Sequence, residues 1–312
     1  MLIIDTHSHL WLRQDTHWNE MAIRTRDDNG SRSDFLGELR QMLPPFMTDG
    51  RNTAEVFLSN MDYAQVAAAV VVQEFIDGQQ NDYLQEVATR YPDRFFCYAM
   101  ADYLHDGFFD EARTLMDVQG FRGMAIPGHR LLGRPLNSEE MMRMFHLMEN
   151  KGWYLSITLA DGDEQVGQLR EVVAECHRLK VAIGHLGMAN PPLTPPWENE
   201  SWRQQILLAR NENVVVETGG ITWLYNDEFY PFPSAIRAIR DAAELVGWES
   251  VMWGSDYPRT ITAITYRMSY DFISRSRELT ESQKAAVLGL NARRFYGFGT
   301  LPELPYIKNM SE

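Results

Sequence analysis

Strand-like apolar runs recur eight times along this chain, and a segment with helical spacing of its apolar residues follows each. The runs are Leu2–Thr6, Ala67–Gln73, Phe95–Met100, Phe121–Ile126, Trp153–Leu159, Val181–His185, Asn213–Glu217 and Ser250–Gly254. Most are apolar without interruption, as in AAAVVVQ and NVVVE, which is typical of parallel strands that are buried on both faces. This repetition constrains the fold more than any other feature of the sequence.

The intervening segments place apolar residues three and four positions apart, as amphipathic helices do. They are Ala54–Tyr63, Asp82–Tyr91, Phe109–Val118, Glu139–Lys151, Val166–Arg178, Trp202–Arg210, Ser234–Leu245 and Leu279–Phe295. Eight alternating units predict an α/β fold, namely a (β/α)₈ TIM barrel that residues 1–312 form as a single domain. An open doubly wound sheet is the alternative, but no Gly-rich dinucleotide loop follows the first strand.

Two long segments interrupt the alternation. Residues 11–52 follow the first strand, and the Pro-rich residues 190–199 follow the sixth. Both come after the carboxyl ends of strands, which is the face where barrel enzymes build their active sites. We therefore expect two loop insertions at the active-site face, with plain surface decoration as the alternative.

Composition excludes several classes of protein. The 312 residues carry 29 Lys and Arg against 43 Asp and Glu, a net charge of −14, so no phosphate-neutralising excess indicates a nucleic-acid partner. No apolar stretch approaches the ~20 residues that span a bilayer, and the N-terminus has no secretory pattern. The two cysteines, Cys97 and Cys176, lie in apolar segments and are expected to be free thiols. We expect a cytoplasmic protein with a small-molecule substrate, and a homo-oligomer would be ordinary for such a barrel.

Titratable side chains follow four of the eight predicted strands. His7 and His9 end the first strand, and residues two apart on a strand point the same way. His185 ends the sixth strand and Asp256 follows the eighth, while His129 and Arg130 follow the fourth. In a barrel all these strand ends meet at one rim, so the residues predict a converging site. A structural hydrogen-bonding role for each is the alternative.

The motifs that carry these residues resemble a known family. D-T-H-S-H after the first strand, G-H-L-G after the sixth and G-S-D-Y-P after the eighth resemble the amidohydrolase superfamily. Within it they are similar to the branch that holds aminocarboxymuconate-semialdehyde decarboxylase and 2-pyrone-4,6-dicarboxylate lactonase. The resemblance covers nearly the whole chain. It implies a (β/α)₈ fold, with His7 and His9 as the metal pair, His185 as a catalytic or ligating residue, and Asp256 as the eighth-strand carboxylate.

The fifth strand departs from the family pattern. Members that bind metal often carry a His there, but Thr158 stands at the corresponding position, and a neutral hydroxyl is a poor ligand for a divalent ion. Two schemes stay open. In one, His7, His9 and Asp256, with or without His185, hold one Zn²⁺ or Mn²⁺ that activates a water. In the other no ion is present, the three histidines donate hydrogen bonds to an oxyanion, and Asp256 alone is the general base.

Substrate recognition has fewer signals. Arg130 and Arg259 follow strands four and eight, where each could grip a carboxylate or form a salt bridge at the rim. His129 is a further candidate for substrate binding. Aromatic residues that follow strand ends could stack on a ring or pack the loops; they are Trp11, Trp197, Trp223, Tyr225 and Tyr257. Glu217 ends the seventh strand, and an inward carboxylate beside Asp256 would raise one of the two pKa values.

The function that this reasoning favours is hydrolysis of a lactone or related cyclic ester of a small carboxylated or sugar-derived compound, with Asp256 as general base. A lactone needs less assistance than an amide because its alkoxide leaves more readily. A metal-dependent decarboxylase of an aromatic or muconate-type acid is the second hypothesis. A binding barrel without turnover is the third, although the full set of His7, His9, His185 and Asp256 argues against it.

Overall fold

The computed structural model describes residues 1–188 and 198–312, and its strands alternate with helices as the sequence predicts. Each predicted apolar run overlaps a strand. The barrel strands are β1 (Ile4–Ser8), β6 (Ala68–Val71), β7 (Phe95–Cys97), β8 (Gly123–Pro127), β9 (Tyr154–Thr158), β10 (Lys180–Ile183), β11 (Val214–Glu217) and β12 (Val251–Met252). All pair in parallel, in the orders β1-β6-β7 and β12-β11-β10-β9-β8.

Two isolated parallel bridges join these sheets into a closed barrel. Ala99, beyond β7, pairs with Met124 of β8, and Ser8 of β1 pairs with Tyr257, beyond β12. At the second seam the amide of His9 donates to the carbonyl of Tyr257 at 2.7 Å. The (β/α)₈ barrel is therefore confirmed, with β1 and the segment after β12 as adjacent elements.

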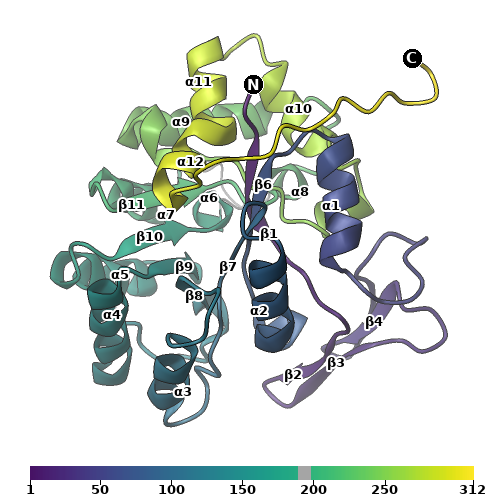
Figure 1. Cartoon of the computed structure of the whole chain (residues 1–312). Coiled ribbons are helices and arrows are strands. Elements are labelled where there is room, and N and C mark those ends of the chain that lie inside the picture. The colour runs from purple at the N-terminus through teal and green to yellow at the C-terminus, as the bar shows by residue number, and fades with distance from the viewer. Residues whose placement is uncertain (189–197) are drawn as a thin grey trace.

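Helices cover the outside of the barrel (Figure 1). They are α1 (Ala54–Tyr63), α2 (Asn81–Arg90), α3 (Phe108–Leu115), α4 (Glu139–Lys151), α5 (Glu164–Glu175), α6 (His185–Met188), α7 (Glu200–Ile206), α8 (Ile221–Leu224), α9 (Pro233–Val246), α10 (Met268–Ser274), α11 (Glu281–Ala285) and α12 (Asn291–Tyr296). Thr280 caps α11 by accepting from the amide of Gln283 at 3.3 Å. The predicted helix Leu279–Phe295 is interrupted, because a π-helical turn, Ala286–Leu290, separates α11 from α12.

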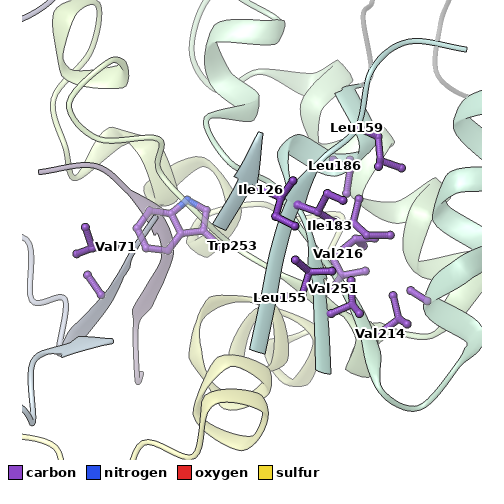
Figure 2. Packing of buried hydrophobic residues seen from close by; sticks show 14 of the residues in the cluster. Val71, Ile126, Leu155, Leu159, Ile183, Leu186, Val214, Val216, Val251 and Trp253 are labelled. Atoms are coloured by element: carbon purple, nitrogen blue, oxygen red, sulfur yellow. The ribbon is translucent and has the colours of Figure 1, made fainter. Parts of the chain in front are cut away.

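Alternation along the strands divides the core into two layers. Ala68 and Val70 of β6 pack inside the barrel, whereas Ala69 and Val71 pack outward against the helices. Burial on both faces is why the strands read as uninterrupted apolar runs. Figure 2 shows part of the outer layer, where Ile126, Leu155, Ile183 and Val216 of four neighbouring strands gather.

The insertion after β1 is not the loop that the sequence predicts. Residues 11–52 contain an antiparallel four-stranded sheet, which lies beyond the end of β1 (Figure 1). Its strands are β2 (Asp15–Trp18), β3 (Met21–Thr25), β4 (Arg32–Phe35) and β5 (Glu38–Gln41). These strands are short and partly exposed, so they lack an apolar run that sequence reasoning could detect. Most of the second insertion, 190–199, lies outside the described residues.

Candidate active site and metal centre

A β-bulge aims the two histidines of β1 into the barrel. Asp5 pairs with Ala69 and Ser8 pairs with Val71, so three steps on β1 match two steps on β6. The extra residue reverses the alternation, and His7 and His9 line the cavity at the barrel mouth, while Asp5 contacts Ser255 on another side. Bulges re-aim side chains in this way near active sites. The sequence prediction that both histidines project together is consistent with this geometry.

Three ligand atoms converge at the base of the cavity. The Nε2 atoms of His7 and His9 lie 3.2 Å apart, and Asp256 Oδ1 lies 3.3 Å from His9 Nε2 and 3.8 Å from His7 Nε2. Two nitrogens at Zn–N bond lengths and a tetrahedral angle would be about 3.3 Å apart. The separations therefore suit a single divalent ion, and His7, His9 and Asp256 form a candidate metal site.

Buried carboxylates hold the opposite edges of both imidazole rings. His7 Nδ1 lies 2.7 Å from Glu217 Oε1, and His9 Nδ1 lies 2.6 Å from Asp77 Oδ2. A carboxylate behind a histidine fixes its tautomer and is the usual support of a metal ligand. Burial raises the pKa of Glu217 to about 8 and lowers the pKa of His7 to about 3. A cation on the Nε2 side of His7 would favour the ionised carboxylate, so this pair also fits a metal.

Asp256 is the ionised carboxylate of the site. Burial alone would raise its pKa, but the hydrogen bond with His9 and the positive charge on that imidazole outweigh burial and hold the pKa well below its ordinary value. Burial likewise opposes the charged form of His9, yet the carboxylates of Asp77 and Asp256 raise the His9 pKa well above its ordinary value. The indole N–H of Trp223 donates to Asp256 Oδ2 at 2.6 Å and leaves Oδ1 facing the histidines.

His185 is neutral, with its accepting nitrogen free. Its Nδ1 donates to the carbonyl of Gly219 at 2.6 Å, so Nε2 carries the lone pair. Burial, followed by the neighbouring His7, lowers its pKa to about 4. A neutral His185 of this tautomer cannot donate to an oxyanion. The structure therefore does not supply the donor that the ion-free scheme assigns to His185.

Most of the predicted site residues share one cavity of about 420 Å³. The predicted residues that line this cavity are His7, His9, Trp11, His129, Arg130, Thr158, His185, Trp223, Asp256 and Arg259. The residues come from the ends of β1, β8, β9 and β10 and from the segments after β11 and β12. This is the carboxyl-terminal rim, the face at which barrel enzymes place their active sites.

Two predicted aromatic residues do not reach the cavity. Tyr257 is buried in the core, where its ring stacks on Phe57 with centroids 4.1 Å apart. Strand alternation does not describe this position, because it lies beyond β12 and Asp256 has a positive φ of 56°. Tyr225 is also buried and does not line the cavity. Trp197 lies outside the described residues.

The two predicted arginines have different surroundings. Arg130 Nε lies 2.6 Å from Glu74 Oε1, so the ion pair considered from the sequence is present, although Arg130 still lines the cavity. Arg259 stacks its guanidinium over the Trp223 ring at 3.6 Å. Among the residues that the structure describes, no carboxylate lies within ion-pair distance of Arg259.

Several site residues could not be identified from the sequence. Asp77 and Glu74 belong to a short 3₁₀ turn (Phe75–Asp77) and its cap after β6. Arg40, Gln41 and Met42 reach the cavity from β5 and the residue after it. Glu74 and Asp77 could have been noticed in the sequence only as acidic residues that follow the end of a predicted strand.

A family comparison covers nearly the whole chain. The sequence model described as "Amidohydrolase" matches residues 4–298. A search of the curated proteins finds no match.

Solved structures share the fold at low identity. A probable 2-pyrone-4,6-dicarboxylic acid hydrolase from Acinetobacter baumannii, with citric acid bound, has a TM-score of 0.72 and 21% identity over 96% of this chain and 100% of that one. A zinc-bound amidohydrolase from Burkholderia multivorans has a TM-score of 0.69 and 17% identity over 97% and 100%. A 5-carboxyvanillate decarboxylase from Novosphingobium aromaticivorans, complexed with manganese and 4-hydroxy-3-methoxy-5-nitrobenzoic acid, has a TM-score of 0.63 and 16% identity over 95% and 96%.

Proposed function

Because this chain belongs to the amidohydrolase family, we propose that it is a hydrolase that opens a lactone or related cyclic ester of a small carboxylated or sugar-derived compound. One observation carries the proposal: the Nε2 atoms of His7 and His9 and Oδ1 of Asp256 converge at the base of the cavity, beside the lone pair of His185. This arrangement combines a cation site, an ionised carboxylate and a neutral base at the closed end of a pocket.

His7, His9 and Asp256 would hold one Zn²⁺ or Mn²⁺, the ions that the similar structures contain. When bound, such an ion lowers the pKa of a water toward ~7 and polarises a carbonyl. Glu217 and Asp77 orient the two imidazoles for this role.

Asp256 takes the proton of the attacking water and passes it to the leaving alkoxide. Trp223 restricts the carboxylate to one orientation through the bond to Oδ2, so Oδ1 is directed at the reacting centre. His185 accepts a hydrogen bond from the water at its free Nε2 and orients the attack. The low pKa of Asp256 makes it a weak base, which suits a readily cleaved ester better than an amide.

Arginines supply recognition of a carboxylated substrate. Arg259 lines the cavity without an ion-pair partner in the described part of the chain, and Arg40 reaches the same cavity from β5. Desolvation lowers the pKa of Arg259; the carboxylate of Asp256 opposes this shift, and the guanidinium groups of Arg40 and Arg130 add to it. A substrate carboxylate would relieve the repulsion among the three guanidinium groups, since it adds a negative charge between them.

Decarboxylation of an aromatic acid is the second candidate. One observation favours it: the cavity places Trp223 and His185 in an edge contact, with centroids 5.7 Å apart, next to the three ligand atoms, so a planar ring could be held beside the cation. In that case the ion site would hold the carboxylate, and Asp256 or His185 would move the proton.

The test measures acid release and carbon dioxide release separately. Purified protein is offered a panel of carboxylated lactones, sugar lactones and hydroxybenzoic acids, before and after chelation and after readdition of Zn²⁺ or Mn²⁺. Acid release without gas supports the lactonase, and gas release supports the decarboxylase. Full activity of the metal-free protein would contradict the role assigned to the His7–His9–Asp256 site.

A further inference from the structure

A second cluster of metal-binding side chains lies between the neighbouring helices α4 and α5 (Figure 1). His146 and Glu149 lie three residues apart on α4, and Cys176 follows the last residue of α5. Their ligand atoms all lie within 4.8 Å of one another, and none of the three residues lines the catalytic cavity. We propose that His146, Glu149 and Cys176 form a zinc site that is separate from the active site.

The spacing of the two strongest ligands fits a zinc ion. Cys176 Sγ lies 3.5 Å from His146 Nδ1. At a tetrahedral angle, a Zn–S bond of about 2.3 Å and a Zn–N bond of about 2.0–2.1 Å place sulfur and nitrogen about 3.6 Å apart. The two side chains thus already hold the separation that a shared ion requires.

Neighbouring side chains and backbone groups orient His146 and Glu149. His146 Nε2 lies 2.7 Å from Glu175 Oε1, a carboxylate–histidine contact that directs the Nδ1 lone pair toward the sulfur. Glu149 Oε1 accepts from the amide of Arg178 at 2.8 Å, which anchors the carboxylate beside the other two ligands. The active site uses the same plan, since carboxylates there support both His7 and His9.

The donor set selects the kind of ion. Thiolate, imidazole and carboxylate together suit Zn²⁺, with a water in the fourth position, whereas Mg²⁺ and Ca²⁺ prefer oxygen ligands alone. Binding would replace the thiol proton of Cys176, and the ion would tie α4 to the end of α5. Because the cluster lies apart from the cavity, this ion would take no part in the chemistry proposed for the active site.

Cobalt is the most direct probe of this site. Co²⁺ bound by a thiolate gives an intense charge-transfer absorption in the near ultraviolet, whereas the nitrogen and oxygen ligands of the active site give none. Metal-free protein is titrated with Co²⁺, and the band is expected to saturate by two added equivalents, one for each proposed site, and to disappear when Zn²⁺ displaces Co²⁺. A titration of the unaltered protein that yields no such band overturns the proposal, and this test needs no variant to fold.

Three variants test whether the cobalt absorption band arises from Cys176. Cys176→Ser is expected to abolish it, lower the bound zinc by one equivalent and leave turnover unchanged. The matched control is Cys97→Ser at the other buried cysteine, which should keep the band. His7→Ala should lose the active-site ion and keep the band, so failure of the proposed function leaves this test intact. A band that survives Cys176→Ser, or that vanishes in Cys97→Ser, contradicts the assignment.

Discussion

At the scale of the residue, the proposed chemistry depends most on Asp256. It offers Oδ1 to the candidate metal site and receives the indole hydrogen bond of Trp223 on Oδ2. Asp256→Asn keeps the shape of the side chain and removes the negative charge and the base. We expect turnover to fall by about 10²–10⁴-fold or more, because general base catalysis contributes about that factor. Steady-state kinetics checks this, and circular dichroism confirms that the barrel is retained. Near-normal turnover in this variant would remove Asp256 from the mechanism.

The second prediction concerns Asp77, the carboxylate that supports the proposed metal ligand His9. Asp77 contacts His9 Nδ1 and also caps the turn in which it lies, where it accepts from the amide of Glu74. Asp77→Asn keeps an acceptor at this position but loses the charge that supports His9. Loss of such a supporting group typically weakens metal binding by about 10–100-fold. Competition with a chromophoric chelator measures the affinity. The control, Asp82→Asn, changes an exposed carboxylate on α2, and an equal loss of affinity there would refute the role of Asp77.

At the scale of the element, the seam between β1 and β12 depends on one buried side chain. Asp5 accepts hydrogen bonds from the amide and hydroxyl of Ser255 at 2.8 and 2.5 Å and from the Tyr266 hydroxyl at 2.7 Å. Asp5→Ala would leave these donors buried without their acceptor, at a cost in the free energy of unfolding of about 1–3 kcal/mol for each donor that stays unsatisfied. Urea denaturation should show the lower midpoint. Asp15→Ala, which alters a carboxylate 69% exposed in the small sheet, should shift it far less.

The β2–β5 sheet gives a prediction about substrate binding. It brings Arg40 to the rim of the cavity, although all of β5 is exposed and Arg40 also pairs with Glu38 at 2.9 Å. Arg40→Ala removes one of the guanidinium groups proposed to face a substrate carboxylate. A charge-assisted hydrogen bond contributes about 1.5–3 kcal/mol, so KM should rise about tenfold or more, with kcat changed little. Arg24→Ala is the matched control on β3, because Arg24 is 69% exposed and pairs with Asp15. Similar KM values in the two variants would exclude Arg40 from recognition.

The sequence predicts elements and strand-end residues better than it predicts directions. His7, His9, His185 and Asp256 were found because each follows a strong apolar run, and a closed barrel brings such strand ends together. Tyr257 was misplaced because position after a strand does not by itself say which way a side chain points. Asp256 lies beyond β12 and has a positive φ, so the alternation of a strand could not have placed its neighbour.

Other features depend on tertiary contacts that no local pattern records. The bulge in β1 is visible only as a shift in the pairing of Asp5 and Ser8 with β6. The β2–β5 sheet is built from short, half-exposed strands joined by tight turns such as Asn19–Glu20, where both residues have positive φ. Such turns favour Asn and Gly, and Glu20 is an unusual occupant, so the first hairpin lacked its usual sequence signal.

At the scale of the whole molecule, the candidate metal site couples the two ends of the chain. His7 and His9 lie on β1, while Asp256 follows β12, and the three meet only because the barrel closes between these strands. Among the residues that the structure describes, no helix is long and apolar enough to cross a membrane. Because the three ligands meet only in the closed barrel, the folded state is the one that an ion would bind, and the unfolded chain has no preformed site.

Metal binding should consequently stabilise the fold as well as support turnover. An ion at 100 times its Kd stabilises the folded state by about 2.7 kcal/mol, which corresponds to a rise in Tm of a few degrees. We expect Tm to rise with the logarithm of the zinc concentration and to fall on chelation together with activity. The experiment uses the Cys176→Ser background, so that only the active-site ion contributes. Adding His9→Ala should remove the dependence of Tm on zinc, whereas adding Asp82→Asn should preserve it. If Tm still rose with zinc after His9→Ala, the stabilising ion would have to bind elsewhere, and the coupling of the chain ends through His7, His9 and Asp256 would be wrong.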